Sequence, residues 1–224
     1  MTDQVGPAAP VYWPELADRG RRVASRRRRW LIAGIVVAVL VTVTGAVGLW
    51  PVSEPATAEA GRVVDLAERE LGNGDRDHEV DGCNFYSGQA RGGGSGCRAG
   101  WSRGAWCADF ARYLWTNAGV SGAKELDEWA RSGRRYGERH GTWHPADSDY
   151  TPRPGDLVVY RDGAFEAPDG NSDHIGVVTA AHVGWFSTIE GNVTGGAAGG
   201  VTARRHIPRG WGTIEGFASP AALH

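Results

Sequence analysis

HIGVVTAAHVGWFSTIEGN, residues 174–192, contains two runs rich in β-branched and aromatic residues, separated by a short connection. Runs of this length and composition predict β-strands. The two runs are His174–Ala180 and Trp185–Glu190. A hairpin centred near His182 would place His174 opposite Glu190, and directly opposed residues on antiparallel strands have Cβ atoms about 4.5–5.5 Å apart. We therefore expect the carboxylate of Glu190 to reach the imidazole of His174.

Further strands and helices are predicted on both sides of this hairpin. The other strand-like runs are Asp156–Tyr160, Val201–His206 and Gly212–Phe217. Segments with helical spacing of apolar residues are Ala58–Leu71, Ala105–Ala118 and Lys124–Arg135. The stretch 73–104 is dominated by Gly, Asp, Ser and Arg and predicts a long loop. Helices that come first and strands that follow favour an α+β domain, with the helices packed on a mainly antiparallel sheet.

Cys107 lies in the first turn of the helix predicted at 105–118. Only the thiolate form of a cysteine attacks, and the N-terminal end of a helix favours an anion. A cysteine with a histidine base, oriented in turn by an acidic or amide group, is activated toward acyl chemistry. His174 and Glu190 supply such a pair, and Asn192 would point to the same side as Glu190 if the strand continues. The alternative is a small buried cysteine with no chemical role.

Four short motifs resemble, in the same order, those of the CHAP family of cysteine- and histidine-dependent amidohydrolases and peptidases. They are WCADF at 106–110, PGDLVVY at 154–160, HIGVV at 174–178 and IEGN at 189–192. The resemblance extends over roughly residues 58–220. It implies a papain-like α+β fold and a peptidoglycan substrate, cleaved at the amide between sugar and stem peptide or within the peptide.

The resemblance also implies roles for individual residues. Cys107 is similar to the family's nucleophile, and His174 to its general base. Glu190 is similar to the group that orients the imidazolium, and Asn192 to an additional polar stabiliser. Two other functions remain open on the sequence: a non-catalytic module that binds the cell wall, and an NlpC/P60-type hydrolase. The second usually has an acidic residue followed by Cys-Ser-Gly, which differs from the residues around Cys107.

The chain contains three cysteines, Cys83, Cys97 and Cys107. In an oxidising compartment a pair tends to form a disulfide and an odd cysteine is left free. Cys83 and Cys97 flank a glycine-rich stretch, and closing a loop of this length would stabilise the fold by about 3 kcal/mol. We therefore expect a disulfide between Cys83 and Cys97, which leaves Cys107 free. The sequence alone leaves open that any two of the three, or none, are joined.

Residues 30–50, WLIAGIVVAVLVTVTGAVGLW, carry no charge and are long enough to cross a bilayer as a helix. The arginines at 26–29 are expected to stay cytoplasmic, which puts the C-terminal domain outside the cell membrane. The alternative is a signal peptide cleaved after Ala58, which would release the domain. The expected division is a cytoplasmic tail at 1–29, a transmembrane helix or signal anchor at 30–50, a linker at 51–57 and a catalytic domain at 58–224.

Charge and spacing argue against several other partners. Seven of the 24 basic residues lie within 1–29, and the remainder of the chain is mildly acidic. A nucleic-acid-binding face should be basic, so we expect no nucleic acid partner.

His140 and His144 are four residues apart, but the Gly and Pro that follow them argue against a shared helix face for zinc. The acidic run 75–81 lacks the glycine and the bidentate glutamate of a calcium loop. We therefore expect no metal and no other cofactor.

Overall fold

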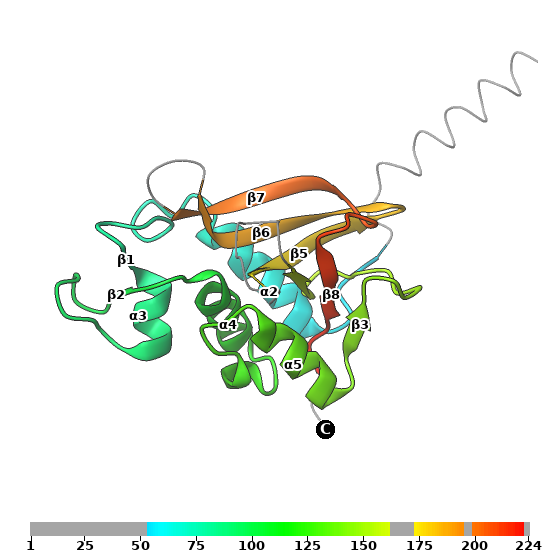
Figure 1. The fold of residues 1–224 in the computed structure, drawn as a ribbon, viewed down its shortest axis with the longest axis horizontal. Helices are drawn as coiled ribbons and strands as arrows, with labels where there is room; N and C mark the ends of the chain where they lie inside the picture. Colours follow the sequence, from blue (N-terminus) through cyan, green and yellow to red (C-terminus); the bar gives the residue numbers. More distant parts are fainter. Residues whose placement is uncertain (1–52, 162–172, 195–198, 222–224) are drawn as a thin grey trace, which may run out of the picture. The chain divides into compact units, whose positions relative to one another are not determined.

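The computed structural model describes residues 53–161, 173–194 and 199–221 (Figure 1). These residues belong to one unit of the chain, Pro51–His224. The apolar segment at 30–50, for which a membrane helix was predicted, lies outside the described residues, as does the tail before it. None of the helices in the described part has the length and apolar character needed to cross a bilayer.

Within the described residues, six antiparallel strands form the main sheet, in the order β3-β8-β4-β5-β6-β7. The strands are β3 (Trp143–Pro145), β4 (Leu157–Tyr160), β5 (His174–His182), β6 (Trp185–Thr194), β7 (Gly199–Pro208) and β8 (Ile214–Ala218). The five strands predicted from the sequence are thus present, and their antiparallel pairing is confirmed. The additional strand, β3, is short and lies at the edge of the sheet, where its proline removes no central ladder hydrogen bond.

Four α-helices accompany the sheet in the described part of the chain. They are α2 (Ala58–Glu70), α3 (Phe85–Arg91), α4 (Cys107–Ala118) and α5 (Arg131–His140). The side chain of Thr57 caps α2 by accepting from the N–H of Ala60. Gly119, in the left-handed conformation, ends α4. The α+β class expected from the order of elements is therefore confirmed.

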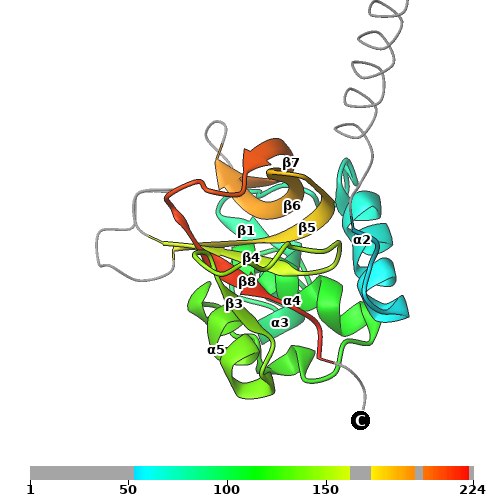
Figure 2. The same cartoon turned by 90° about the vertical axis from the view of Figure 1, so that its right-hand side faces the viewer.

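Side-chain alternation along the strands divides the core into two clusters. On β4, Leu157 and Val159 join the cluster that contains the buried faces of α2, α4 and α5. Val158 and Tyr160 join a second cluster with residues of the other strands. The three helices therefore pack on one face of the sheet, and Figure 1 shows them below strands β5–β7. In the turned view of Figure 2, α2 lies to the right of these strands.

The segment 73–104, predicted as a long loop, contains regular structure. It holds α3 and a two-stranded ribbon made of β1 (Cys83–Asn84) and β2 (Ser102–Arg103). Asn84 caps α3, since its Oδ1 accepts from the N–H of Ser87 at 2.7 Å. The loop prediction was wrong here because a seven-residue helix is too short to display a helical period.

The helix predicted over 124–135 is replaced by two shorter elements. A 3₁₀ turn spans Ala123–Glu125, and α5 begins at Arg131 and ends before Gly141, which is left-handed. Leu126, between them, has an extended backbone that interrupts the helix. The prediction was therefore wrong in both boundaries.

Strands β5 and β6 form the predicted hairpin, with a shorter connection than expected. His182 pairs with Trp185, which leaves a two-residue turn at 183–184. Gly184, at the second turn position, has a φ of 82°, a conformation that glycine adopts without strain. The hairpin is therefore centred beyond His182, and the register that was predicted from a centre at that residue does not hold.

Candidate active site

Cys107 is the first residue of α4, and it is the free cysteine of the chain. Its side chain is buried, with 5% of the residue exposed. Trp106, at the cap position, provides no side-chain hydrogen bond to the first turn. The N–H groups of this turn therefore have no side-chain cap, and the helix dipole at this end favours a negative charge.

The imidazole of His174 and the carboxylate of Glu190 are in contact, although the two residues are not directly opposite. Val177 pairs with Ile189, and this register, continued by one residue, places Gly176 opposite Glu190. Glu190 therefore reaches His174 diagonally, which long side chains can do across an antiparallel pair. Its Oε2 lies 3.1 Å from the Nε2 of His174. The predicted contact is present, but the predicted register was wrong by two residues.

His174 is held between two acidic groups. Burial lowers the pKa of its imidazole, but hydrogen bonds with Cys107 and Glu190 outweigh burial and raise this pKa to about 9. Because Glu190 contacts Nε2, the other ring nitrogen, Nδ1, is the one left for the thiol. The arrangement favours an imidazolium that can share a proton with the sulfur of Cys107.

The Glu190 carboxylate is completely buried and receives hydrogen bonds from several strands. Oε1 accepts from the hydroxyls of Tyr160 at 3.0 Å and Thr188 at 2.6 Å. Oε2 is shared by His174 and by the Nε of Arg204, at 2.9 Å. Burial alone would raise the pKa of Glu190, but His174, Thr188 and Arg204 lower it below its usual value. The carboxylate therefore stays ionised without contact with solvent.

These contacts form a polar row across four neighbouring strands, with one residue each from β4, β5, β6 and β7. The row consists of Tyr160, His174, Glu190 and Arg204. Tyr160 pairs directly with His174 in the β4–β5 ladder, and Arg204 pairs with Thr188 in the β6–β7 ladder. Sequence reasoning missed Tyr160, Thr188 and Arg204. All three lie in segments that were predicted as strands, but only the strand order and register bring them to Glu190.

Asn192 departs from the alternation expected of a regular strand. Its φ is 59°, and the pairing of β6 with β7 is irregular just after Glu190. Its Oδ1 lies beside Gly199, where a Cβ atom would be 2.6 Å away. Glu79 reaches the same place and also accepts from the indole N–H of Trp106 at 3.3 Å. The structure therefore places the side-chain oxygen of Asn192 beside the start of β7.

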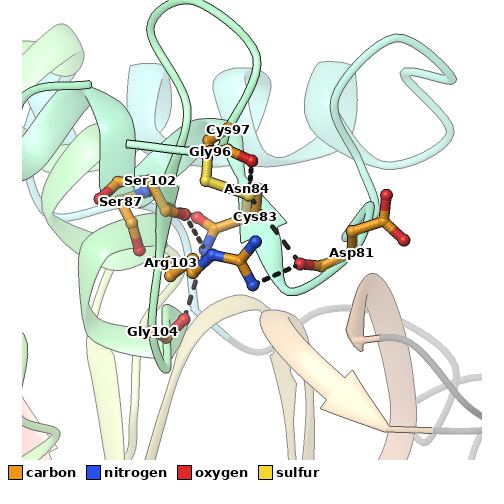
Figure 3. Close-up of a disulfide and its surroundings, with 9 residues drawn as sticks. All are labelled: Asp81, Cys83, Asn84, Ser87, Gly96, Cys97, Ser102, Arg103 and Gly104. Atoms are coloured by element: carbon orange, nitrogen blue, oxygen red, sulfur yellow. Dashed lines mark hydrogen bonds between the residues drawn. A yellow bond between two sulfur atoms is a disulfide. The ribbon is translucent and has the colours of Figure 1, made fainter. Parts of the chain in front are cut away.

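The predicted disulfide between Cys83 and Cys97 is present (Figure 3). Next to it, the amide nitrogen of Asn84 donates to the backbone carbonyls of Ser102 and Gly104, both at 3.3 Å. The disulfide and these hydrogen bonds connect the start of α3 with the segment that leads into α4. They fix the chain that immediately precedes the free cysteine.

An ion pair between a buried carboxylate and a partly exposed guanidinium makes a second connection between α3 and α4. Asp109, two residues after Cys107, is completely buried. Its Oδ2 accepts from the hydroxyl of Ser87 and the guanidinium of Arg91, both at 2.7 Å. Burial raises the pKa of Asp109 despite these partners. Asp109 therefore anchors the first turn of α4 to α3.

In the part of the chain that the structure describes, no group of three or more His, Cys, Asp or Glu side chains could hold a metal ion. His140 and His144 have separate partners. His140 lies 3.2 Å from the carboxylate of Glu125, whereas the ring of His144 stacks on that of Tyr150.

Comparison with known proteins identifies one family. The family model of the CHAP domain matches residues 99–192, a range that contains Cys107, His174, Glu190 and Asn192. No curated protein and no solved structure matched the chain. CHAP domains are typically hydrolases of the amidase or peptidase class. Residues 99–192 of the chain are therefore similar to a CHAP domain.

Proposed function

We propose that this protein is an extracytoplasmic cysteine hydrolase that cleaves amide bonds in peptidoglycan, as an N-acetylmuramoyl-L-alanine amidase or an endopeptidase. The observation that carries the proposal is the imidazole of His174, hydrogen-bonded both to Cys107 and to the buried carboxylate of Glu190. This is the arrangement needed to activate a thiol toward acyl transfer. The match of residues 99–192 to the CHAP domain model supports peptidoglycan as the substrate class.

In the first half of the proposed reaction, the thiolate of Cys107 attacks the carbonyl carbon of the substrate amide. A carbon–sulfur bond forms, and the carbonyl electron pair moves to the oxygen. Backbone N–H groups at the start of α4 are suited to stabilise this negative charge. When the tetrahedral species collapses, the carbon–nitrogen bond breaks and the imidazolium of His174 gives its proton to the leaving amine.

In the second half, neutral His174 removes a proton from water as the water oxygen attacks the thioester. The carbon–sulfur bond breaks, the new carboxylic acid leaves, and the thiolate and the imidazolium are restored. Glu190 keeps the ring in one orientation throughout. We assign Asn192 the role of a further polar stabiliser, beside the start of β7. We also propose a papain-like core, supported by a cysteine at the start of a helix that packs on an antiparallel sheet.

We further propose that residues 30–50 hold the domain at the outer side of the cell membrane, because this segment is uncharged and follows a run of arginines. No nucleic acid or cofactor enters the proposed reaction. Recovery of the full chain in the membrane fraction of cells, with the domain open to external protease, is the expected result. Recovery in the growth medium, cleaved after Ala58, would instead indicate release.

The test of hydrolysis compares the full chain with its Cys107→Ala variant on purified peptidoglycan. We expect the unmodified chain to release soluble fragments and the variant to release none, because no other thiol is free. Equal unfolding temperatures would show that the variant is folded. Mass spectrometry of the fragments distinguishes a freed lactyl-linked sugar from a cleaved cross-bridge. Peptidoglycan that is bound but left uncut by the unmodified chain would favour the alternative, a non-catalytic wall-binding module.

A further inference from the structure

The Glu190 carboxylate has a second cationic partner besides His174. The Nε of Arg204 lies 2.9 Å from Oε2, the same oxygen that contacts the Nε2 of His174. The two partners approach from the strands on either side of β6, because His174 belongs to β5 and Arg204 to β7. Strand β7 lies outside the segment matched by the family model, which ends at residue 192.

The charge of Glu190 needs a partner that does not change during the reaction. A buried carboxylate is costly unless it is paired and hydrogen-bonded. In the proposed reaction His174 is an imidazolium before the amide is cleaved and a neutral ring afterwards. Without Arg204, the Glu190 carboxylate would have only neutral partners at the thioester stage, namely His174 and the hydroxyls of Tyr160 and Thr188. Arg204 stays protonated at every stage, because a guanidinium does not lose its proton in a protein.

We propose that Arg204 is a positioning residue, which keeps Glu190 ionised and directed at His174 while the histidine loses and regains its proton. This inference rests on the proposed function, since it assigns a role to Arg204 within that reaction. The guanidinium acts through Glu190 and is not itself a catalytic residue. Its side chain is 28% exposed, whereas that of Glu190 is fully buried, so one end of the pair remains open to solvent.

The effect of pH on the Glu190–Arg204 pair depends on the charged and titratable groups that face it. Glu190 is faced by Tyr160 from β4, His174 from β5, Thr188 from its own strand and Arg204 from β7. Cys107, on α4, faces His174 from the other side. Loss of Arg204 removes a positive charge that favours the ionised form of Glu190. Glu190 would then take up a proton at a higher pH, and the imidazolium would lose its partner earlier on acidification.

The test uses the full chain with Arg204→Gln, Arg204→Lys and, as a matched control, Arg205→Gln. Arg205 is the exposed neighbour on the same strand, and successive strand residues point to opposite faces. Two quantities are followed against pH: the kcat and KM for peptidoglycan cleavage, and the rate at which iodoacetamide alkylates Cys107. Alkylation forms a carbon–sulfur bond and releases iodide, so it reports the thiolate even without a substrate.

For Arg204→Gln we expect the acid limb of both profiles to move to higher pH by about one unit, because an opposite charge this close lowers a carboxyl pKa by one unit or more. We also expect kcat at pH 7 to fall about tenfold while KM stays unchanged. Arg204→Lys keeps the positive charge but not the position of Nε. Its acid limb should therefore stay in place, and its kcat should lie between those of the unmodified chain and Arg204→Gln. Arg205→Gln should match the unmodified chain.

An Arg204→Gln variant that folds, and keeps both the acid limb and the kcat of the unmodified chain, would overturn the proposal. So would a lowered unfolding temperature with no change in either profile, which is the sign of a purely structural role. If Arg204→Gln does not fold, Arg204→Lys decides, and a kcat equal to that of the unmodified chain then counts against positioning. Rapid alkylation of Cys107 without any cleavage of peptidoglycan would refute the proposed function alone, and the alkylation profiles would still test Arg204.

Discussion

Gly176 gives the Glu190 carboxylate the room that it occupies beside His174. A Cβ atom at position 176 would lie 2.6 Å from the Cγ of Glu190 and 3.1 Å from its carboxyl carbon. Such distances require a shift, and Glu190 has little freedom because it is fully buried and bonded to three other side chains in addition to His174. The site therefore requires a residue without a Cβ atom at position 176.

We predict that Gly176→Ala lowers the rate of peptidoglycan cleavage by about tenfold or more, since small displacements of a positioned group are costly to catalysis. The added methyl group pushes the carboxylate away from the imidazole. Gly210→Ala is the matched control, because a Cβ there meets nothing within 4 Å. Cleavage rates and unfolding temperatures of both variants are the measurement. A Gly176→Ala protein as active as the control would mean that the diagonal contact between Glu190 and His174 is not needed.

Three of the predicted site residues meet in the structure, namely Cys107, His174 and Glu190. Their chemistry and the helix or strand to which each belongs could be inferred from sequence. The partners Tyr160 and Arg204 could not, because finding them requires the strand order and register, which depend on turn length and bulges. The register of the β5–β6 pair shifts at a bulge between residues 178 and 180. The sequence did not predict this bulge.

Among the elements, a disulfide closes the segment that contains α3, and polar contacts join this segment to α4. The disulfide closes the segment between Cys83 and Cys97, and the Asp109–Arg91 ion pair connects the same segment to the first turn of α4. Sequence predicted the disulfide from the glycine-rich stretch between the cysteines. It did not predict α3, which is short and depends on the cap at Asn84 and on close packing against the loop at Gly100.

We predict that the double variant Cys83→Ser/Cys97→Ser loses about 3 kcal/mol of unfolding free energy, the value expected for opening a loop of this length. Chemical denaturation of the full chain measures it. Because the segment also fixes the chain that leads to Cys107, we expect the cleavage rate to fall as well. Ser95→Ala, an exposed change inside the same loop, serves as the control. A double variant with unchanged stability would show that the hydrogen bonds of Asn84 hold the segment without the disulfide.

At the scale of the whole molecule, the order of helices and strands was sufficient to predict the α+β class, since each layer must bury its apolar face against the other. The contacts that connect the entry of β4 with the C-terminal segment were not predictable. Asp156, at the entry to β4, accepts from the backbone N–H of Arg153 at 2.7 Å and from the hydroxyl of Tyr150 at 2.8 Å. Tyr150 in turn contacts Ser219, near the C-terminal end of the described chain.

This junction gives the fold a pH dependence. Burial raises the pKa of Asp156 from its ordinary value of 3.8 to about 6, although Arg153, Tyr150 and Ser219 oppose the rise. A pKa raised in the folded state means that the contribution to stability is fully present below pH 3.8 and is lost as the pH rises through 6. Relative to Asp156→Asn, which cannot ionise, the unmodified chain should therefore lose on the order of 3 kcal/mol between pH 4 and pH 7. Unfolding free energies at both pH values measure the difference. Asp149→Asn, a change at an exposed neighbour, is the control and should show the same pH dependence as the unmodified chain. If the unfolding free energies of Asp156→Asn and the unmodified chain change in parallel with pH, Asp156 does not change its charge in this range.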